Sequence, residues 1–312
     1  MSFSSDVKEE LSRIFCKSCC HKTELISFIR SAGTIKISGG ENPRHYLQMQ
    51  TVHAPTMRKV YKLLKLQGIS PDGIAVKKNK FLKDNSLYMM TVVLQDAKDI
   101  MVDLHLFDDM ASVYDRMGLK KRCCKAAYLR GAFLGSGSIS DPKGPYHMEF
   151  AFSNRNFADT LSGLINEFRL NSKVMERKNN YMVYLKGGDS ISDLLGIMGA
   201  HNSLLKFEDI RVLKEMRNSV NRRVNCETAN LNKTIRAAFR QIDAIDFLME
   251  KNEFDDLPEN LKEVARLRLE YPDLSLQELG NFMTPILGKS GVSYRLKKIE
   301  GIADKFKQER GE

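Results

Sequence analysis

A repeat offset by 104 residues constrains the fold of this chain more than any other feature of its sequence. Shifting the chain by that interval places like residues on one another: Lys17 on Lys121, Cys19 on Cys123, Cys20 on Cys124, Leu25 on Leu129, Gly33 on Gly137 and Ile35 on Ile139. The segment LISFIRSAGTI thus has a counterpart in LRGAFLGSGSI. Each predicts a helix of small and apolar residues that runs into a strand, so we expect a chain of two similar halves.

The sequence after each copy predicts the same order of elements. Two β-type runs joined by a turn-rich stretch are followed by an amphipathic helix, a second hairpin and a closing helix, expected around 96–107 and 189–200. Each copy is therefore helix–strand–strand–helix–strand–strand–helix. This order predicts an α+β fold, αββαββα twice, in a domain at 1–205 with repeats at about 17–110 and 121–205.

Small residues four positions apart recur in the repeated helices, as Ser27 and Ser31 in one copy and Gly131 and Gly135 in the other. Such residues allow two helix backbones to approach closely. We therefore expect the repeated helices to pack on each other at a pseudo-two-fold axis.

Basic residues are concentrated in the N-terminal two-thirds of the chain. The whole chain has 49 basic and 39 acidic residues, a formal net charge of +10, whereas residues 252–312 hold 10 basic and 12 acidic ones. This excess indicates a polyanionic partner, with nucleic acid as the main candidate. The composition supports equally well a soluble protein whose basic charge has no such partner.

The sequence lacks the features of membrane-spanning, secreted and disulfide-rich proteins, and this predicts its cellular location. No apolar run approaches the length that spans a bilayer, and residues 1–15 have no apolar core of a signal peptide. Six cysteines in 312 residues do not form a disulfide scaffold. We expect a cytoplasmic protein that does not contact membranes.

Residues 206–257 predict a helical connector rich in Asn and Arg. An amphipathic helix at 207–220 leads into 217–236, which fits no simple period and either contacts phosphates or is a solvated connector. Over 231–249, successive apolar residues lie alternately four and three positions apart, as in a heptad repeat. Because the run covers fewer than three heptads, a helix packed on a neighbouring element is favoured over a dimer interface. Residues 252–260 break the pattern and are interpreted as a linker.

Residues 258–308 predict an all-α helix-turn-helix domain. Pro258 is placed at a helix start, and Ser275 with Glu278 forms a capping box for a second helix. Ser290 is expected to cap a third helix, at 290–299, whose inward face is Val292, Leu296 and Ile299 and whose outward face is small, polar and basic. That combination favours a DNA recognition helix over an ordinary three-helix bundle.

The candidate DNA contacts come from this domain and from the connector. Small and polar residues near a helix start reach base edges, while Arg and Lys hold phosphates. The predicted contacts are Ser275, Lys289, Ser290, Gly291, Ser293, Tyr294, Arg295, Lys297 and Lys298 in the domain, with Arg217, Arg222, Arg223 and Lys233 in the connector.

The cysteines raise the question of a metal. Three cysteines and a histidine lie within 16–21, and a two-fold fold would bring the pair Cys19–Cys20 against the pair Cys123–Cys124. Of these cysteines, only Cys16 and Cys19 have the Cys-x-x-Cys spacing that is common among zinc ligands. Free cysteine is among the most buried residue types, so core packing is favoured and no metal or other cofactor is expected.

The segment LRGAFLGSG resembles the LAGLIDADG motif of homing endonucleases, and the order of elements in each repeat is that of their fold. The resemblance implies a saddle of strands along DNA and an acid before the final glycine of each motif helix, which holds divalent metal. Here those positions are Ala32 and Ser136, and the acid two residues earlier is replaced by Arg30 and Leu134. Metal-dependent hydrolysis needs hard oxygen ligands, so we expect no catalytic residues.

Asp141 supports an enzymatic alternative. It lies just after the second copy of the motif, but its repeat counterpart is Ile37, so it restores no symmetric pair of acids. A metal-dependent nuclease with unorthodox ligands that include Asp141 is the alternative to a fold that binds DNA without cutting it.

Three stretches together resemble the WhiA family of bacterial regulators: KKRCCKAAYLRGAFL, GAHNSLLKFEDIRVLKEMRNSVNRRVNCETANLNKTI and LGKSGVSYRLKKI. The resemblance implies a cytoplasmic, nucleoid-associated regulator of transcription that binds promoter DNA sequence-specifically and lacks nuclease activity. It also implies roles in cell division, chromosome segregation and sporulation, with RNA polymerase or cell-division proteins as candidate partners. The alternative is a DNA-associated scaffold for division or segregation proteins with no role in transcription.

Overall fold

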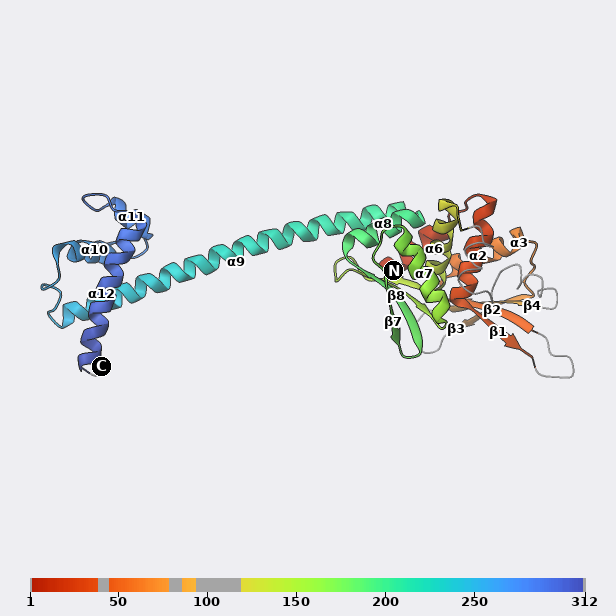
Figure 1. Cartoon of the computed structure of the whole chain (residues 1–312), viewed down its shortest axis with the longest axis horizontal. Coiled ribbons are helices and arrows are strands. Elements are labelled where there is room, and N and C mark those ends of the chain that lie inside the picture. The colour runs from red at the N-terminus through yellow and green to blue at the C-terminus, as the bar shows by residue number, and fades with distance from the viewer. Residues whose placement is uncertain (1, 39–44, 79–85, 94–118, 311–312) are drawn as a thin grey trace. The chain divides into compact units, whose positions relative to one another are not determined.

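The chain folds into two compact units, Met1–Glu215 and Met216–Glu312, each with a hydrophobic core of its own. The computed structural model in Figure 1 describes residues 2–38, 45–78, 86–93 and 119–310. The division falls inside one helix, so the connector expected at 206–257 does not stand apart as a third segment.

The first unit contains the two repeats. A leading helix, α1 (Phe3–Ser12), precedes them. The first repeat consists of α2 (Ser18–Ala32), β1 (Gly33–Ile37), β2 (His45–Thr51), α3 (Ala54–Leu66), β3 (Gly73–Lys78) and β4 (Ser86–Val93). The second consists of α6 (Arg122–Ser136), β5 (Gly137–Ile139), β6 (His147–Phe152), α7 (Arg155–Glu167), β7 (Lys173–Arg177), β8 (Asn180–Lys186) and α8 (Gly188–Met198). The closing helix expected at 189–200 is α8, whereas the one expected at 96–107 lies outside the described residues.

Each repeat forms one four-stranded antiparallel sheet with the same strand order, β1-β2-β4-β3 in the first and β5-β6-β8-β7 in the second. Side chains alternate between a buried and a less buried face, as in β6, where Met148, Phe150 and Phe152 are buried and the residues between them are half-buried. The identical strand order confirms the αββαββ order predicted for both repeats, and α8 completes the second one.

The repeated helices α2 and α6 lie side by side (Figure 1). A Cβ atom at Gly131 would lie 2.2 Å from the Glu24 carbonyl oxygen, and one at Gly135 would lie 2.6 Å from the Ser31 Cβ. The helices therefore approach backbone to backbone, and the expected role of the small residues is confirmed.

Three charged side chains are buried beside this contact. The carboxylate of Glu24 accepts hydrogen bonds from Arg130 Nε and Nη2, both at 3.1 Å, and forms an ion pair with Lys59. Lys59 Nζ also donates to the Leu11 carbonyl at 2.8 Å, and Arg130 Nη1 donates to the Met198 carbonyl at 2.9 Å. One buried carboxylate thus links α2 to α3 and α6, and its cationic partners reach α1 and α8.

The second unit is helical. Its elements are most of α9 (His201–Glu250), α10 (Glu259–Glu270), α11 (Leu276–Asn281) and α12 (Lys289–Arg310). Residues 217–236, for which the sequence gave no period, belong to α9, a single helix of 50 residues. The recognition helix expected at 290–299 is longer than predicted and runs to Arg310.

The end of α9 packs into the core of the second unit. Ile245 and Leu248 are fully buried there with residues of α10 and α12. Phe254 and Leu257 are also buried, so the stretch interpreted as a linker contributes to this core. Upstream, Leu231 and Phe239 remain more than half exposed on α9.

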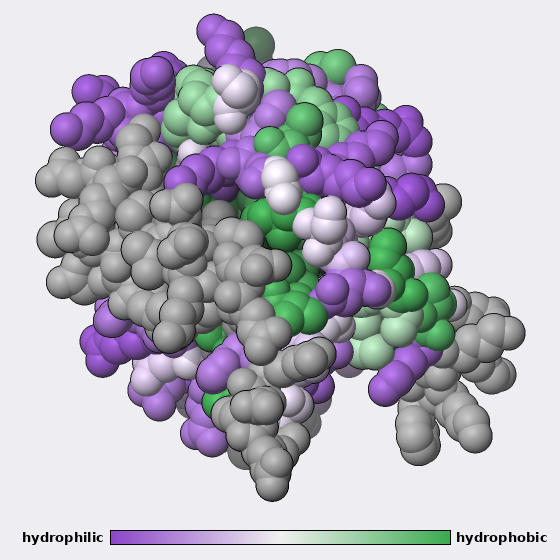
Figure 2. All heavy atoms as spheres, turned by 90° about the vertical axis from the view of Figure 1, so that its right-hand side faces the viewer, coloured by the Kyte–Doolittle hydropathy of each residue, from purple (hydrophilic) through white to green (hydrophobic). Residues whose placement is uncertain are grey.

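Hydrophilic side chains cover most of the described surface of the first unit in Figure 2, with hydrophobic groups in patches between them. The edge strands β1 and β3 contribute exposed apolar residues: Ile35, Ile37, Ile74 and Val76. Within the part of the chain that the structure describes, no helix is both long and apolar enough to cross a bilayer.

The α2–α6 contact predicts an unusual response to alanine. Gly131→Ala should lower the free energy of unfolding by about 1–3 kcal/mol through overpacking, although alanine normally stabilises a helix relative to glycine. Gly196→Ala in α8 is the matched control, because its Cβ would meet only a Leu204 methyl group at 3.6 Å. Urea denaturation of both variants checks this, and equal stabilities would contradict the close approach.

Candidate nucleic-acid interface

Local hydrogen bonds fix the start of the helix-turn-helix. Ser275 Oγ accepts from the Glu278 N–H at 3.3 Å, and the Glu278 carboxylate accepts from the Ser275 N–H at 2.8 Å. The predicted capping box of α11 is therefore confirmed. Hydrogen bonding of the Glu278 carboxylate to the side chain and the backbone N–H of Ser275 lowers the pKa of Glu278. The turn before it is held by buried Arg268, whose Nη1 donates to the carbonyls of Pro272 and Leu274.

The loop 282–288 joins α11 to α12 and folds back on the end of α11. The Leu287 N–H donates to the Gly280 carbonyl at 3.0 Å, and a Cβ at Gly280 would lie only 1.9 Å from the Leu287 carbonyl oxygen. Glycine is required at 280 because the returning backbone occupies the space of a side chain.

The start of α12 differs from the sequence prediction. The helix begins at Lys289, whose N–H donates to Gln277 Oε1 at 3.3 Å, and the N–H groups of Gly291 and Val292 donate to the Gly288 carbonyl. The prediction that Ser290 caps this helix is wrong, because Ser290 lies within its first turn.

The inward face of α12 is as predicted, and the outward face is as predicted except for Arg295. Val292, Leu296 and Ile299 are fully buried against the core of the second unit. The outward face exposes Lys289, Ser290, Tyr294, Lys297 and Lys298, with Gly291 and Ser293 half-buried beside them and Ser275 half-buried at the start of α11. From Lys289 to Ile299 the helix carries no carboxylate, so its exposed surface is electropositive.

Arg295 does not join this outward face. Its Nη1 donates to the Asn260 carbonyl at 3.2 Å and lies 3.5 Å from a carboxylate oxygen of Glu263, both on α10. Only 20% of the side chain is exposed. The prediction that Arg295 points outward is wrong, because the guanidinium joins α12 to α10. The signal that sequence analysis missed is Glu263 on the neighbouring helix.

The four predicted connector contacts are all exposed on α9, but they do not share one face. Successive residues of a helix are about 100° apart, which places Lys233 within about 20° of Arg222 and puts Arg217 about 140° away. The same arithmetic puts Arg236 and Arg240 close to the direction of Arg222. Sequence analysis missed these two arginines, which helical spacing would have found.

The degenerate motif lies where α2 and α6 end. Ala32 and Ser136 are the last residues of the two helices, and both are half-buried. The Ser136 hydroxyl donates to the Ala132 carbonyl at 3.4 Å, and Asp141 is exposed in a turn where it accepts from the Lys143 N–H. No acid stands at either motif position.

The outer face of the first sheet carries polar and basic groups. Lys36 pairs with Tyr46 and Thr34 pairs with Gln48, on the side opposite buried Leu47. In the described strands this face holds no carboxylate, and Lys36 and Lys77 are exposed on it. Sequence analysis missed these residues, although the alternation in the two β-type runs would have indicated the face.

The structure brings four of the cysteines together. Cys19 and Cys20 of α2 meet Cys123 and Cys124 of α6, as the two-fold axis implied. Cys16, which supplied the Cys-x-x-Cys spacing, lies apart from them and accepts a hydrogen bond from Arg130 at 3.2 Å.

The fold and its domains are those of a LAGLIDADG-like tandem repeat joined to a helix-turn-helix. Three domain families match the chain in order: the WhiA N-terminal LAGLIDADG-like domain at 18–107, the WhiA LAGLIDADG-like domain at 125–217 and the WhiA C-terminal HTH domain at 220–303. The chain belongs to the WhiA family.

Relatives and a solved structure agree along nearly the whole chain. A probable cell division protein WhiA from Thermoanaerobacter pseudethanolicus is 50% identical, covering 99% of each chain. One of the same name from Alkaliphilus oremlandii is 45% identical, covering 99% of this chain and 98% of the relative. The crystal structure of full-length WhiA from Thermatoga maritima superposes with a TM-score of 0.60 at 25% identity, covering 98% of this chain and 99% of that one.

The position of Arg295 predicts a structural effect. Arg295→Ala should lower the free energy of unfolding of the second unit by about 1 kcal/mol, because it removes a charged hydrogen bond and a partly exposed ion pair. Lys298→Ala, on the exposed face, should change it by less than about 0.5 kcal/mol. Urea denaturation measures both, and an Arg295 variant as stable as the control would contradict the assignment.

Proposed function

We propose that this protein is a sequence-specific DNA-binding regulator that has lost the nuclease chemistry of its fold. The observation that carries the proposal is the exposed face of α12, which joins a small and polar first turn to a basic stretch without a carboxylate. Ser290, Tyr294 and Lys297 would face the major groove, with Lys289 and Lys298 on phosphates.

The neighbouring helices support α12 in this role. The capping box of α11, buried Arg268 and the Arg295 contacts with α10 hold the helix-turn-helix in one conformation. A helix held this way loses little conformational entropy when it enters a groove, which favours affinity. The side chains of Arg222 and Lys233 lie on the same face of α9 and are proposed as additional phosphate contacts.

The loss of nuclease chemistry follows from Ala32 and Ser136. A methyl group and a hydroxyl do not replace the two carboxylates that would hold divalent metal beside a phosphate. Asp141, the acid that the nuclease alternative invokes, accepts a backbone hydrogen bond in an exposed turn and has no symmetric partner. The repeat unit is therefore proposed to bind or to support binding, and not to cut.

The biological role is proposed from the relatives. Those with 43% to 50% identity carry the name probable cell division protein WhiA, which supports a role in cell division here. We further propose that the role is exerted by transcription from bound promoters on the nucleoid, with chromosome segregation and sporulation among the affected processes. RNA polymerase and division proteins are the partners that such a role would involve.

Charge removal on α12 tests the DNA interface. The full-length double variant Lys289→Ala/Lys298→Ala should bind promoter DNA more weakly, and the slope of log K against log salt should fall by about two because the two proposed phosphate contacts are lost. Fluorescence anisotropy across a series of salt concentrations measures both quantities.

The matched control is Lys262→Ala/Arg266→Ala on α10, which changes net charge equally outside the exposed face of α12. Binding that does not depend on salt, or equal losses in the two double variants, would refute the interface. If the full chain binds no DNA under any condition but still binds a partner protein, the scaffold alternative would be favoured.

Cleavage assays test the missing chemistry. Incubation of the full chain with duplex DNA and Mg²⁺ or Mn²⁺ should leave the DNA intact. Cleavage that disappears in Asp141→Asn would revive the nuclease with unorthodox ligands and would overturn the proposal that the fold no longer cuts.

A further inference from the structure

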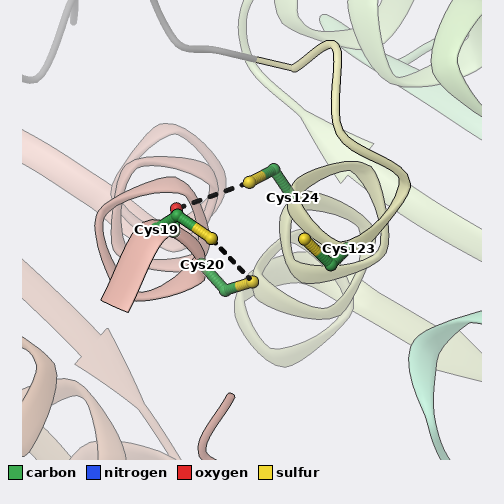
Figure 3. Close-up of side chains that lie close together, drawn as sticks. All are labelled: Cys19, Cys20, Cys123 and Cys124. Carbon is green, nitrogen blue, oxygen red and sulfur yellow. Dashed lines mark hydrogen bonds between the residues drawn. The ribbon is translucent and has the colours of Figure 1, made fainter. Parts of the chain in front are cut away.

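Four cysteines form a compact group at the N-terminal ends of α2 and α6. Figure 3 shows Cys19 and Cys20 facing Cys123 and Cys124 across the two helices. The four Sγ atoms all lie within 4.8 Å of one another, and the Cys19 and Cys20 sulfurs are 3.9 Å apart. We propose that these four thiolates bind one Zn²⁺ ion that fastens the two repeats together.

The distances suit a single tetrahedral ion. A zinc–sulfur bond of about 2.3 Å places the sulfurs of a tetrahedral site about 3.8 Å apart. The Sγ atoms of Cys19 and Cys20 are already separated by about this distance. The longest Sγ–Sγ distances in the group must shorten by about 1 Å, which small rotations about χ1 can achieve. An iron–sulfur cluster would need wider spacing, because its irons and sulfides lie between the thiolates.

Core packing alone does not explain the group. Cys20 and Cys124 are buried with Ala127 in a small cluster, as packing cysteines are. Cys19 and Cys123, however, are exposed, yet their sulfurs complete the group. Packing gives no reason for two exposed sulfurs to converge on two buried ones, whereas a four-ligand metal site requires all four.

The surroundings suit a negatively charged site. Four thiolates with one Zn²⁺ carry a net charge of about −2. Both helices begin at the cysteines with neither a side-chain cap nor an acid in the first turn, so two positive dipole ends meet there. Lys17 and Lys121 are the N-cap residues, and Arg122 follows directly.

Zinc binds the thiolate form of cysteine, so binding displaces the thiol protons. Zinc affinity should therefore rise with pH, and binding should release protons into the buffer.

The site would act at the end of the helix pair remote from Ala32 and Ser136. Gly131 and Gly135 hold the helices together in their C-terminal halves, whereas the cysteines lie in the first turns. A zinc ion would therefore cross-link the two repeats where the glycine contact does not reach.

Metal analysis of the full chain tests the proposal. The protein, produced with a tag that has no histidine cluster and purified without chelator, should contain about one zinc per chain by mass spectrometry. Replacement by Co²⁺ should give the thiolate-to-cobalt charge-transfer and visible bands of a tetrahedral four-sulfur site. Removing the metal should lower the unfolding temperature.

Variants of the exposed ligands separate metal loss from misfolding. Cys19→Ser and Cys123→Ser should each reduce bound zinc to background while circular dichroism stays unchanged, because both side chains lie outside the core. Cys226→Ser, at an exposed cysteine on α9, should keep the zinc. Zinc retained in the Cys19 and Cys123 variants would overturn the assignment.

Three further outcomes would also overturn the proposal. The first is a wild-type chain that neither contains zinc nor takes it up from buffered Zn²⁺ solution. The second is stoichiometric iron in place of zinc. The third is a disulfide between the two helices in protein isolated under thiol-trapping conditions.

Discussion

The contact between α2 and α6 is the interaction on which the first unit depends. Because Gly131 and Gly135 have no side chains, the two backbones meet directly, and each sheet is then held by the helix of its own repeat. The depth of that approach leaves no room for a Cβ, so the geometry of both sheets follows from two glycines. At the ends of the two helices, where the resemblance to LAGLIDADG nucleases implies metal-binding acids, this chain has Ala32 and Ser136.

The proposed DNA interface depends on local charge and not on the charge of its domain. Residues 252–312 hold more acids than bases, yet α12 has no carboxylate between Lys289 and Ile299. The acids are used elsewhere: Glu278 caps α11, and Glu263 pairs with Arg295. These two acids therefore stabilise the scaffold of the domain and do not neutralise Lys297 and Lys298.

The repeat and its strands were predictable because identical residues recur at a fixed offset and each strand alternates between core and solvent. The capping box was predictable because it is local. The continuity of α9 was not, since residues 217–236 are exposed on all sides and therefore show no period of burial. The position of Arg295 depends on a residue 32 positions away, Glu263, which no local pattern reveals. For the cysteines, the repeat predicted that Cys19 and Cys20 meet Cys123 and Cys124, whereas the Cys-x-x-Cys spacing was misleading because Cys16 lies outside the group.

The buried carboxylate of Glu24 has a consequence for which halves can associate. At the repeat offset its counterpart is Tyr128, and the counterpart of Arg130 is Ile26, so each half supplies one ion that the other lacks. Two first repeats brought together would bury two Glu24 carboxylates that keep Lys59 but lack the Arg130 guanidinium, and losing one partner of a buried ion pair is destabilising. Two second repeats would bury two Arg130 guanidinium groups without a Glu24 carboxylate. The junction therefore favours a first repeat packed on a second repeat over two copies of the same repeat.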